Sequence, residues 1–473
     1  MEKDIILIDK KKDILKILEY SFKITYLILA IGTFNSFTFG TPIMSILVMV
    51  TFGLGCILML ERLLHWKQYI SMPYLVWLVL FCVSFVVSTI ANAKYGFMEN
   101  AKWLVWTSFQ MLLLYVVRND KTIEEQKKEH TVISKIIIGY SFGAALISIL
   151  LLLVRYSHMW VMEANDQRII QGVLWGRLWG VYTDPNYGAV IGVISILLSL
   201  YFLHGLLGRK RVFYKLNIIL QFLYIVFSDS RTGMVALLVS VGFYIYTTLL
   251  KKNSGKINVK QRLKNIFITV CICLLMLTGL KLVKIVYNEM VSPVMTTLFF
   301  SDEEENEDEE EKEMEEKIGR EEDIKADPSN RRFDIWGSGI EILNTTPVVG
   351  TGYTTFVSYT KDNVPDTYVL TNDHGVFGNM HNSFLNILVY QGVFGFVAFM
   401  IFVFSTIIKV FKNIWILDGE QYRYAITMLS CIAAVVCSMM FLLEGVYTNS
   451  IGSIVLWSFL GYIIQLIFTQ KTE

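Results

Sequence analysis

Three arginines and one histidine stand out in a chain that is otherwise dominated by apolar residues. Arg177, Arg231, Arg332 and His381 each lie beside a long apolar segment. Arginine keeps its charge and its planar guanidinium binds phosphate oxygens in pairs, whereas histidine exchanges protons near neutral pH. These residue types suit a reaction in which cations hold an anionic leaving group while the imidazole takes a proton from an acceptor hydroxyl.

A sugar joined through a diphosphate to a membrane lipid would match that chemistry. The arginines would bind the diphosphate and stabilise the charge that develops as the glycosidic bond to phosphate breaks. Beside His381, no Asp, Glu or His stands at metal-ligand spacing. We therefore expect a reaction without a metal or another cofactor, and no nucleic-acid partner.

Two of the arginines lie at predicted turns. Arg177 precedes Pro185-Asn186, which suits the start of a helix because proline is tolerated in the first turn. Arg231 lies in the hexapeptide 228–233, which we interpret as the tip of a helical hairpin. Taken singly, the first segment is equally an interfacial loop, and Arg231 is equally an arginine that extends to the membrane surface.

The segment around Arg332 predicts an amphipathic helix. Ser329 or Asn330 is the expected N-cap, and the apolar stripe consists of Phe333, Trp336, Ile340 and Leu343. Arg332 lies four residues before Trp336 on the face that is expected to pack inward. It therefore needs an anionic partner, either a carboxylate of the chain or a ligand.

Two short motifs follow this helix. Gly350-x-Gly352 permits close approach of the backbone, although as a phosphate loop it is a weak signal. His381-Asn382 opens a helical run that is expected to break at Gly392. A lone histidine in this position is usually an interfacial residue with a hydrogen bond, but here three arginines accompany it.

The elements that must position these residues are transmembrane helices. The 473 residues are 54% hydrophobic and 18% charged, and about 20 consecutive apolar residues span a bilayer. We predict an all-α polytopic membrane protein with about twelve transmembrane helices, over residues 20–38, 42–60, 72–90, 101–117, 133–154, 187–207, 214–228, 233–250, 266–286, 393–410, 425–443 and 451–468.

Lysine and arginine indicate the orientation of these helices. With the N-terminus inside, the predicted cytoplasmic segments contain 25 Lys and Arg, whereas the short outer loops contain 6. Both termini are therefore expected in the cytoplasm, with one long extracytoplasmic loop over 287–382. Within that loop, residues 301–325 carry 15 acidic and 4 basic residues. They indicate a solvated insert, with a cation-binding or docking segment as the alternative.

The stretch from about Leu216 to Ile401 resembles the domain shared by O-antigen ligases and Wzy-type O-antigen or capsule polymerases. The motifs that carry the resemblance are Ser230-Arg231-Thr232-Gly233, Arg332-x-x-x-Trp336, Pro347 with Gly350-x-Gly352, and His381-Asn382 before Gly392. Arg177 with Pro185-Asn186 is similar to the family's upstream segment. The resemblance covers a little under half of the chain, and it divides the chain into 1–215, 216–401 and 402–473.

That resemblance implies a GT-C-like membrane glycosyltransferase of polysaccharide biosynthesis, in the bacterial cytoplasmic membrane. Its donor would be an undecaprenyl-diphosphate-linked glycan at the outer face, and its acceptor another glycan or a lipid. Arg231 and Arg332 would contact the diphosphate, and His381 would act as the general base. The further substrate-binding residues would be Arg177, Asn382, Gly350 and Gly352. Polymerase and ligase differ in their acceptor, so both stay open.

Two other functions also stay open. A flippase or transporter of lipid-linked oligosaccharides has a similar number of spans, but ion-coupled transporters place ionisable residues near the bilayer midplane, often in repeated halves. In this chain, Lys281, Lys284 and Glu444 lie towards predicted helix ends. A binding protein that recruits partners through the acidic loop would leave the arginines and His381 unexplained.

Overall fold

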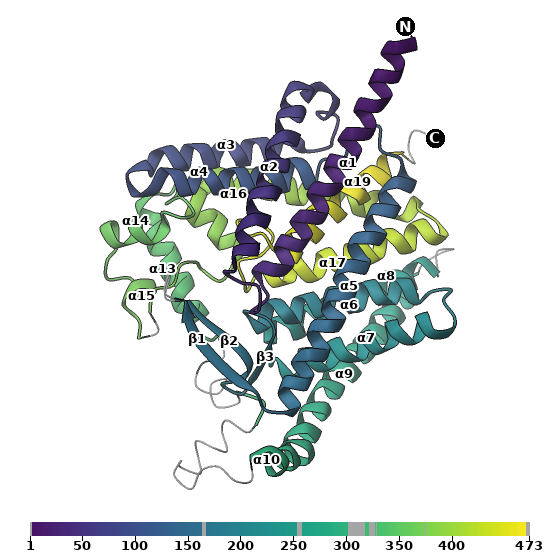
Figure 1. Cartoon of the computed structure of the whole chain (residues 1–473), viewed down its shortest axis with the longest axis vertical. Helices are drawn as coiled ribbons and strands as arrows, with labels where there is room; N and C mark the ends of the chain where they lie inside the picture. Colours follow the sequence, from purple (N-terminus) through teal and green to yellow (C-terminus); the bar gives the residue numbers. More distant parts are fainter. Residues whose placement is uncertain are drawn as a thin grey trace.

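The computed structural model describes residues 2–162, 167–252, 258–300, 317–320, 327, 329–373 and 375–469. Most of the acidic segment 301–325 therefore lies outside the described residues. Within them the chain is mainly helical, with one small β-sheet beside the helical bundle (Figure 1).

The α-helices follow one another along the whole described chain. They are α1 (Glu2–Thr33), α2 (Pro42–Leu64), α3 (Leu75–Ala91), α4 (Ala93–Phe109), α5 (Ile123–Leu153), α6 (Pro185–Leu203), α7 (Gly208–Phe227), α8 (Arg231–Lys252), α9 (Val259–Val286), α10 (Ser292–Phe300), α13 (Arg332–Thr345), α14 (Phe356–Asn363), α15 (Tyr368–Thr371), α16 (Ser383–Asn413), α17 (Gly419–Met439), α18 (Ile451–Ile454) and α19 (Leu460–Thr469). Single π-helical turns continue α4, α9 and α18, over Gln110–Leu114, Tyr287–Val291 and Val455–Phe459.

Eight helical stretches in the described part of the chain are long and apolar enough to cross a membrane. They comprise α2, α5, α6, α8, α9 with α10, α16, α17, and α18 with α19. The other four segments predicted from the sequence fall on α1, α3, α4 and α7. α3 and α4 have 17 residues each, and the apolar parts of α1 and α7 are interrupted by charged residues. A multi-pass membrane protein is confirmed, and the count of twelve spans stays a prediction.

The centre of the bundle is formed by α6, α17 and the last stretch of the chain. In the most apolar 18-residue part of each of these three stretches, 67%, 72% and 89% of the residues are buried. In the corresponding part of Val259–Leu298, only 6% of the residues are buried. α6 packs against α5, α7, α8 and α17. The apolar surface of α9 therefore faces lipid, and α6 and α17 provide the rigid core from which the loops project.

The segment between α5 and α6 forms an antiparallel sheet in the order β1–β2–β3, over Ser157–Met162, Gln167–Leu174 and Arg177–Gly180. The prediction of an all-α chain is wrong here. Trp175 and Gly176 have φ values of 53° and 61°, which is the backbone of a two-residue hairpin turn. This turn pairs Arg177 with Leu174 and so sets the arginine at the beginning of β3.

α16 breaks at Gly392, as the sequence predicts. Gly392 has a φ of 65°, and the two glycines of the Gly-x-Gly motif pack against the broken turn. The Gly352 amide donates to the Tyr390 carbonyl at 3.0 Å, and a Cβ on Gly350 would lie 2.4 Å from the Tyr390 carbonyl carbon. These contacts give Gly350 and Gly352 a packing role, so substrate binding by them stays a prediction.

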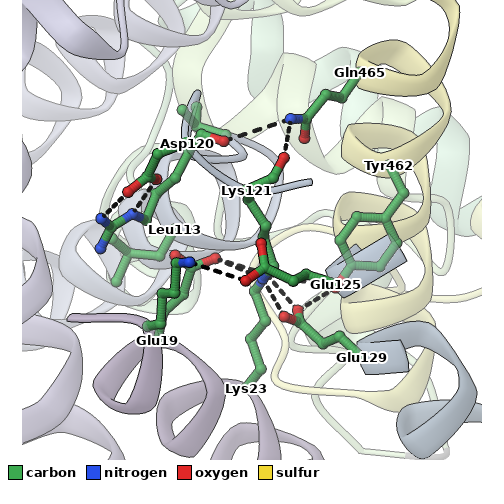
Figure 2. A network of polar contacts seen from close by, with 12 residues as sticks. Glu19, Lys23, Leu113, Asp120, Lys121, Glu125, Glu129, Tyr462 and Gln465 are labelled. Carbon is green, nitrogen blue, oxygen red and sulfur yellow. Dashed lines mark hydrogen bonds and ion pairs between the residues drawn. The ribbon is translucent and has the colours of Figure 1, made fainter. Parts of the chain in front are cut away.

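A cluster of buried charges lies near the start of α5, at the end of that helix far from the β-sheet. Figure 2 shows the side chains of this cluster. Lys23 of α1 lies 3.0 Å from Glu19 and 2.6 Å from Glu129. Lys121 contacts the same two carboxylates, and Tyr462 donates to Glu129. The Lys23, Glu19 and Glu129 side chains are only 0%, 2% and 4% exposed. We name these five residues the ion cluster, which joins α1, α5 and α19.

Candidate active site

Arg177 joins the start of α6 to the turn between α7 and α8. Its Nε donates to the Ser228 carbonyl at 2.9 Å, and its Nη2 donates to Oδ1 of Asn186 at 3.0 Å. The Ser230 hydroxyl donates to the same Asn186 oxygen at 2.9 Å. Arg177 is 8% exposed, and burial, followed by the charge of Arg320, lowers its pKa to about 10. The Pro185-Asn186 segment and the 228–230 turn, both singled out in the sequence, therefore meet at the buried guanidinium of Arg177.

The carboxylate of Asp184 acts on several of these groups. As predicted, α6 begins at Pro185, and the Asp184 side chain caps it, where a carboxylate is stabilised by the helix dipole. The same charge acts on Arg177, Arg332 and His381, and it raises their pKa values against the larger lowering effect of burial. Asp184 is therefore a common neighbour of the candidate cations and the candidate base.

Cations hold the other side of the α7–α8 turn. Asp229, with a φ of 46°, lies 3.0 Å from Lys284 of α9 and 3.5 Å from Nε of Arg320. Arg320 also donates to the Asp229 carbonyl at 3.3 Å. Arg231, two residues further, begins α8 and is half-buried. The turn that presents Arg231 is thus held from two sides.

Residues 317–320 depart from the prediction of a solvated insert. Ile318 is 2% exposed, and its backbone pairs in both directions with the Asn288 side chain, at 3.0 and 2.8 Å. The Gly319 amide donates to the Gly176 carbonyl at 2.9 Å. A Cβ on Gly176 would lie 2.6 Å from the Gly319 oxygen. This close packing of Gly319 against Gly176 of the β-hairpin turn positions Arg320.

α13 begins after the two N-caps predicted from the sequence and buries a different face. Its N-cap is Arg331, with a φ of 64°. Phe333 and Ile340 of the predicted stripe are 70% and 48% exposed, whereas the buried residues are Ile335, Ser338, Gly339 and Ile342. A Cβ on Gly339 would lie 2.8 Å from Sδ of Met380. Close packing on the small residues, rather than on the largest apolar ones, therefore decides which face is buried.

Arg332 is the first residue of α13 and is incompletely satisfied. Its Nε is buried without a hydrogen-bond partner among the described residues, and its Nη1 donates weakly to the Ser329 carbonyl at 3.4 Å. The guanidinium lies 5.5 Å from the centroid of the Phe441 ring. Burial, followed by the charge of Arg231, lowers its pKa. Arg332 and Arg231 therefore lie close enough to repel each other.

His381 lies on a strained turn directly before α16. Its φ is 47°, a left-handed value that costs free energy in a residue other than glycine. Its backbone amide donates to Asn379 at 2.8 Å, and its ring meets Phe377 edge-on at 5.8 Å. The ring nitrogens make no hydrogen bond to any residue that the structure describes. Burial, followed by the charge of Arg332, lowers the pKa of His381, so at pH 7 the ring is neutral and able to accept a proton.

Two contacts hold the His381 turn in place. Nε1 of Trp336 in α13 donates to the Met380 carbonyl at 3.0 Å. Oδ1 of Asn382 caps α16, accepting from the amides of Phe384 and Leu385 at 3.0 and 3.1 Å. Asn382 thus has a positioning role, and its contact with substrate stays a prediction.

A buried carboxyl group lies under the same turn. The Ser383 hydroxyl donates to carbonyls of the α17–α18 loop, at 2.8 Å to Leu442 and 2.9 Å to Glu444. Glu444 is 1% exposed and accepts from the Ser450 hydroxyl. Burial raises the pKa of Glu444 to about 7, and the neighbouring charge of Asp184 adds to this.

The three arginines and His381 predicted from the sequence are thus brought into one cluster, but three further residues of that cluster were missed. Asp184 directly precedes the Pro-Asn pair, and its place as an N-cap was the available signal. Arg320 is hidden in the acidic segment, and Glu444 was noted only as a residue towards a helix end. These residues come from segments far apart in the sequence, so no spacing rule connects them.

Residues 216–400 match the family model described as O-Antigen ligase. This segment is an O-antigen ligase domain. No curated protein matches the chain. The O-antigen ligase domain contains Arg231, Arg332 and His381, whereas Asp184 and Glu444 come from the flanking segments. Together with the membrane helices, this match supports a membrane polysaccharide ligase or polymerase.

Proposed function

We propose that this enzyme transfers or polymerises a glycan carried by undecaprenyl diphosphate, at the outer face of the bacterial cytoplasmic membrane. The observation that carries the proposal is Arg332, whose buried Nε lacks a partner among the described residues, between Arg231 and a neutral His381. A buried cationic group without full hydrogen bonding is costly unless a ligand supplies an anion. A diphosphate supplies that anion and matches the guanidinium fork.

In the proposed reaction the acceptor hydroxyl attacks the anomeric carbon of the donor sugar. The hydroxyl proton passes to a ring nitrogen of His381 as the new glycosidic bond forms. The bond between the anomeric carbon and the phosphate oxygen breaks, and the lipid diphosphate leaves with the electron pair. Arg332 and Arg231 stabilise the charge that grows on that oxygen.

Arg177 and Asp184 are proposed as positioning residues. The donors of Arg177 are directed to the Ser228 carbonyl and to Asn186, so this arginine holds the turn that presents Arg231. Asp184 caps α6, and its negative charge acts on Arg177, Arg332 and His381. This assignment differs from the substrate-binding role that the sequence suggested for Arg177.

The placement at the outer face belongs to the proposal, together with twelve spans, a GT-C-like arrangement and cytoplasmic termini. It is supported by the excess of lysine and arginine in the segments on the other side of the membrane. Single cysteines introduced beside Arg177, Arg231, Arg332 and His381 should react with an impermeant thiol reagent in intact cells. Protection of one of them until lysis would contradict this topology at that position.

Purified protein in detergent tests the reaction itself. Given lipid-diphosphate oligosaccharide alone, a polymerase lengthens the chains, whereas a ligase forms product only after a separate glycan or lipid acceptor is added. Either result supports glycosyl transfer. Absence of product with every acceptor, together with movement of the intact lipid-linked donor across proteoliposome membranes, would instead indicate a transporter.

A further inference from the structure

A basic pocket lies at the helix ends opposite the candidate active site. It encloses about 770 Å³ between α5, the end of α6 and the starts of α7 and α17. α6 has 19 residues and begins beside Asp184, so its far end lies about 28 Å away along the helix axis. The pocket and the candidate active site therefore lie at the two ends of a membrane-spanning helix.

The charges that line this pocket are mostly positive. Its cations are Lys135, Arg209, Lys210 and Arg423, and its carboxylate is Glu420. Glu420 also lies 3.8 Å from Lys127, which is outside the pocket. Its negative charge is therefore shared with Lys127 and balances the four cations less. Nε of Arg423 is buried and has no hydrogen-bond partner within the described ranges. An excess of cations with an unsatisfied guanidinium indicates an anionic ligand.

Aromatic and aliphatic side chains adjoin these cations. Phe202 and Tyr214 of the lining stack with 5.6 Å between ring centroids, and Phe213 meets Tyr214 edge-on at 5.4 Å. In the segment that joins α6 to α7 and near the start of α7, Leu207 and Val212 are 80% and 54% exposed. Aromatic rings beside basic groups are typical of the membrane–water interface, where a lipid places its phosphate and its acyl chains side by side.

We propose that this pocket binds the phosphate headgroup of an anionic phospholipid, with Arg423, Arg209 and Lys210 on the phosphate and the aromatic rings beside the glycerol backbone. The exposed aliphatic residues then contact the acyl chains, which a free phosphate ion would leave uncovered. In the proposed topology the lipid belongs to the cytoplasmic leaflet. The site is separate from the glycosyl-transfer site, and lipid binding does not depend on the activity proposed above.

Native mass spectrometry of the full-length protein, released from micelles with phosphatidylglycerol or phosphatidylcholine, tests this site. The wild type should retain phosphatidylglycerol in preference to phosphatidylcholine. Arg209→Gln and Lys210→Gln should each weaken that retention about fivefold, as expected for one cation at an anionic lipid surface. Both side chains are exposed, so these variants should fold normally. Arg423→Gln should weaken retention at least as much.

The matched control is the pair Lys260→Gln and Arg262→Gln at the start of α9, on the same membrane face but outside the pocket. This pair should retain the lipid as the wild type does. Equal loss in the control pair would show that general surface charge binds the lipid. Full retention by Arg209→Gln with Lys210→Gln would show that the lipid binds elsewhere. Displacement by an equal concentration of inorganic phosphate would assign the pocket to a free anion. Each of these three results overturns the proposal.

Discussion

The ion cluster and the candidate active site lie towards opposite ends of α5, and both bury charged groups, but the two regions satisfy these groups differently. In the ion cluster (Figure 2), Lys23 and Lys121 are each paired with Glu19 and Glu129. In the candidate active site, Arg332 keeps a buried Nε without a partner among the described residues. The His381 ring makes no hydrogen bond to a described residue. A satisfied network holds helices together, whereas incompletely satisfied groups leave room for a ligand.

The ion cluster and the candidate active site also differ in backbone strain. Asp229, Asn330, Arg331 and His381 all have positive φ, and all four lie in turns of the candidate active site. The helical residues of the ion cluster lie within regular helix. Strain of this kind persists where the surrounding structure holds it, and it is concentrated at functional sites. The comparison therefore predicts that changes in the ion cluster affect folding first, and that changes at the site affect turnover first.

The largest effect is expected in the ion cluster. Lys23→Met removes the fully buried cation between two carboxylates, so the free energy of unfolding should fall by about 3 to 5 kcal/mol. Unfolding in detergent at fixed pH measures it. The control is Lys128→Met near the start of α5, because the Lys128 side chain is 75% exposed in its pair with Glu124. Equal stability of Lys23→Met and wild type would remove the distinction between the two regions.

Glu444 should make stability depend on pH. Its pKa is raised from 4.5 to about 7, so between these values the unfolded chain has released a proton that the folded chain keeps. Stability should therefore fall as the pH rises from 4.5 to 7, by up to about 3 kcal/mol, and then level off. Glu444→Gln should lack this decline. Thermal unfolding of both proteins at pH 5 and pH 8 compares them, and parallel pH profiles would contradict a buried carboxyl with a raised pKa.

His381→Ala should lower turnover about a hundred-fold or more, because it removes the proposed base. Donor binding and the amount of folded protein in detergent should stay near those of the wild type. His381→Gln should keep a hydrogen-bonding side chain but should not restore turnover. Near-normal turnover by His381→Ala would remove the histidine from the reaction. The measurement is formation of product from lipid-linked oligosaccharide.

Arg332→Lys should lower turnover by about ten- to a hundred-fold, because an ammonium group cannot reproduce the paired contacts of a guanidinium with a diphosphate. Arg331→Lys, at the neighbouring position, is the matched control and should change turnover little. Titration of the lipid-diphosphate donor onto each folded variant separates binding from chemistry. Equal turnover and equal donor binding by Arg332→Lys and Arg331→Lys would contradict the proposed contact between Arg332 and the diphosphate.

The smallest effect is expected from removal of the acidic segment. Deletion of residues 302–316 should leave turnover and stability nearly unchanged, because a solvated insert adds little but loop length. The deletion must stop before Ile318 and Arg320, which pack against Asn288 and Asp229. A longer deletion of 302–320 serves as the positive control and should impair turnover. Loss of turnover with the shorter deletion at normal expression would indicate a docking role.

The sequence by itself determined the features that have local causes. Blocks of apolar residues predict a multi-pass helical protein, Pro185 marks the start of α6, and Gly392 marks the break in α16. The turn between α7 and α8 follows from a short polar stretch between two apolar runs, although it is limited to residues 228–230 because α8 already begins at Arg231. Each of these signals lies within a few residues of the feature it predicts, since it acts through backbone conformation or through the length of a bilayer-spanning helix.

Only the tertiary structure decided which charges are paired and which are left for a ligand. Lys23 meets Glu129 across 106 positions of the sequence, and Arg320 meets Asp229 across 91. No periodicity marks such partners, because they are selected by the packing of separate helices rather than by neighbouring residues. The buried face of α13 has the same origin, since it depends on how closely Gly339 approaches Met380. The arginines and His381 could therefore be recognised from the sequence, and Asp184 could be recognised as a helix cap, but the nearness of Asp184, Arg320 and Glu444 to them came only from the packed structure.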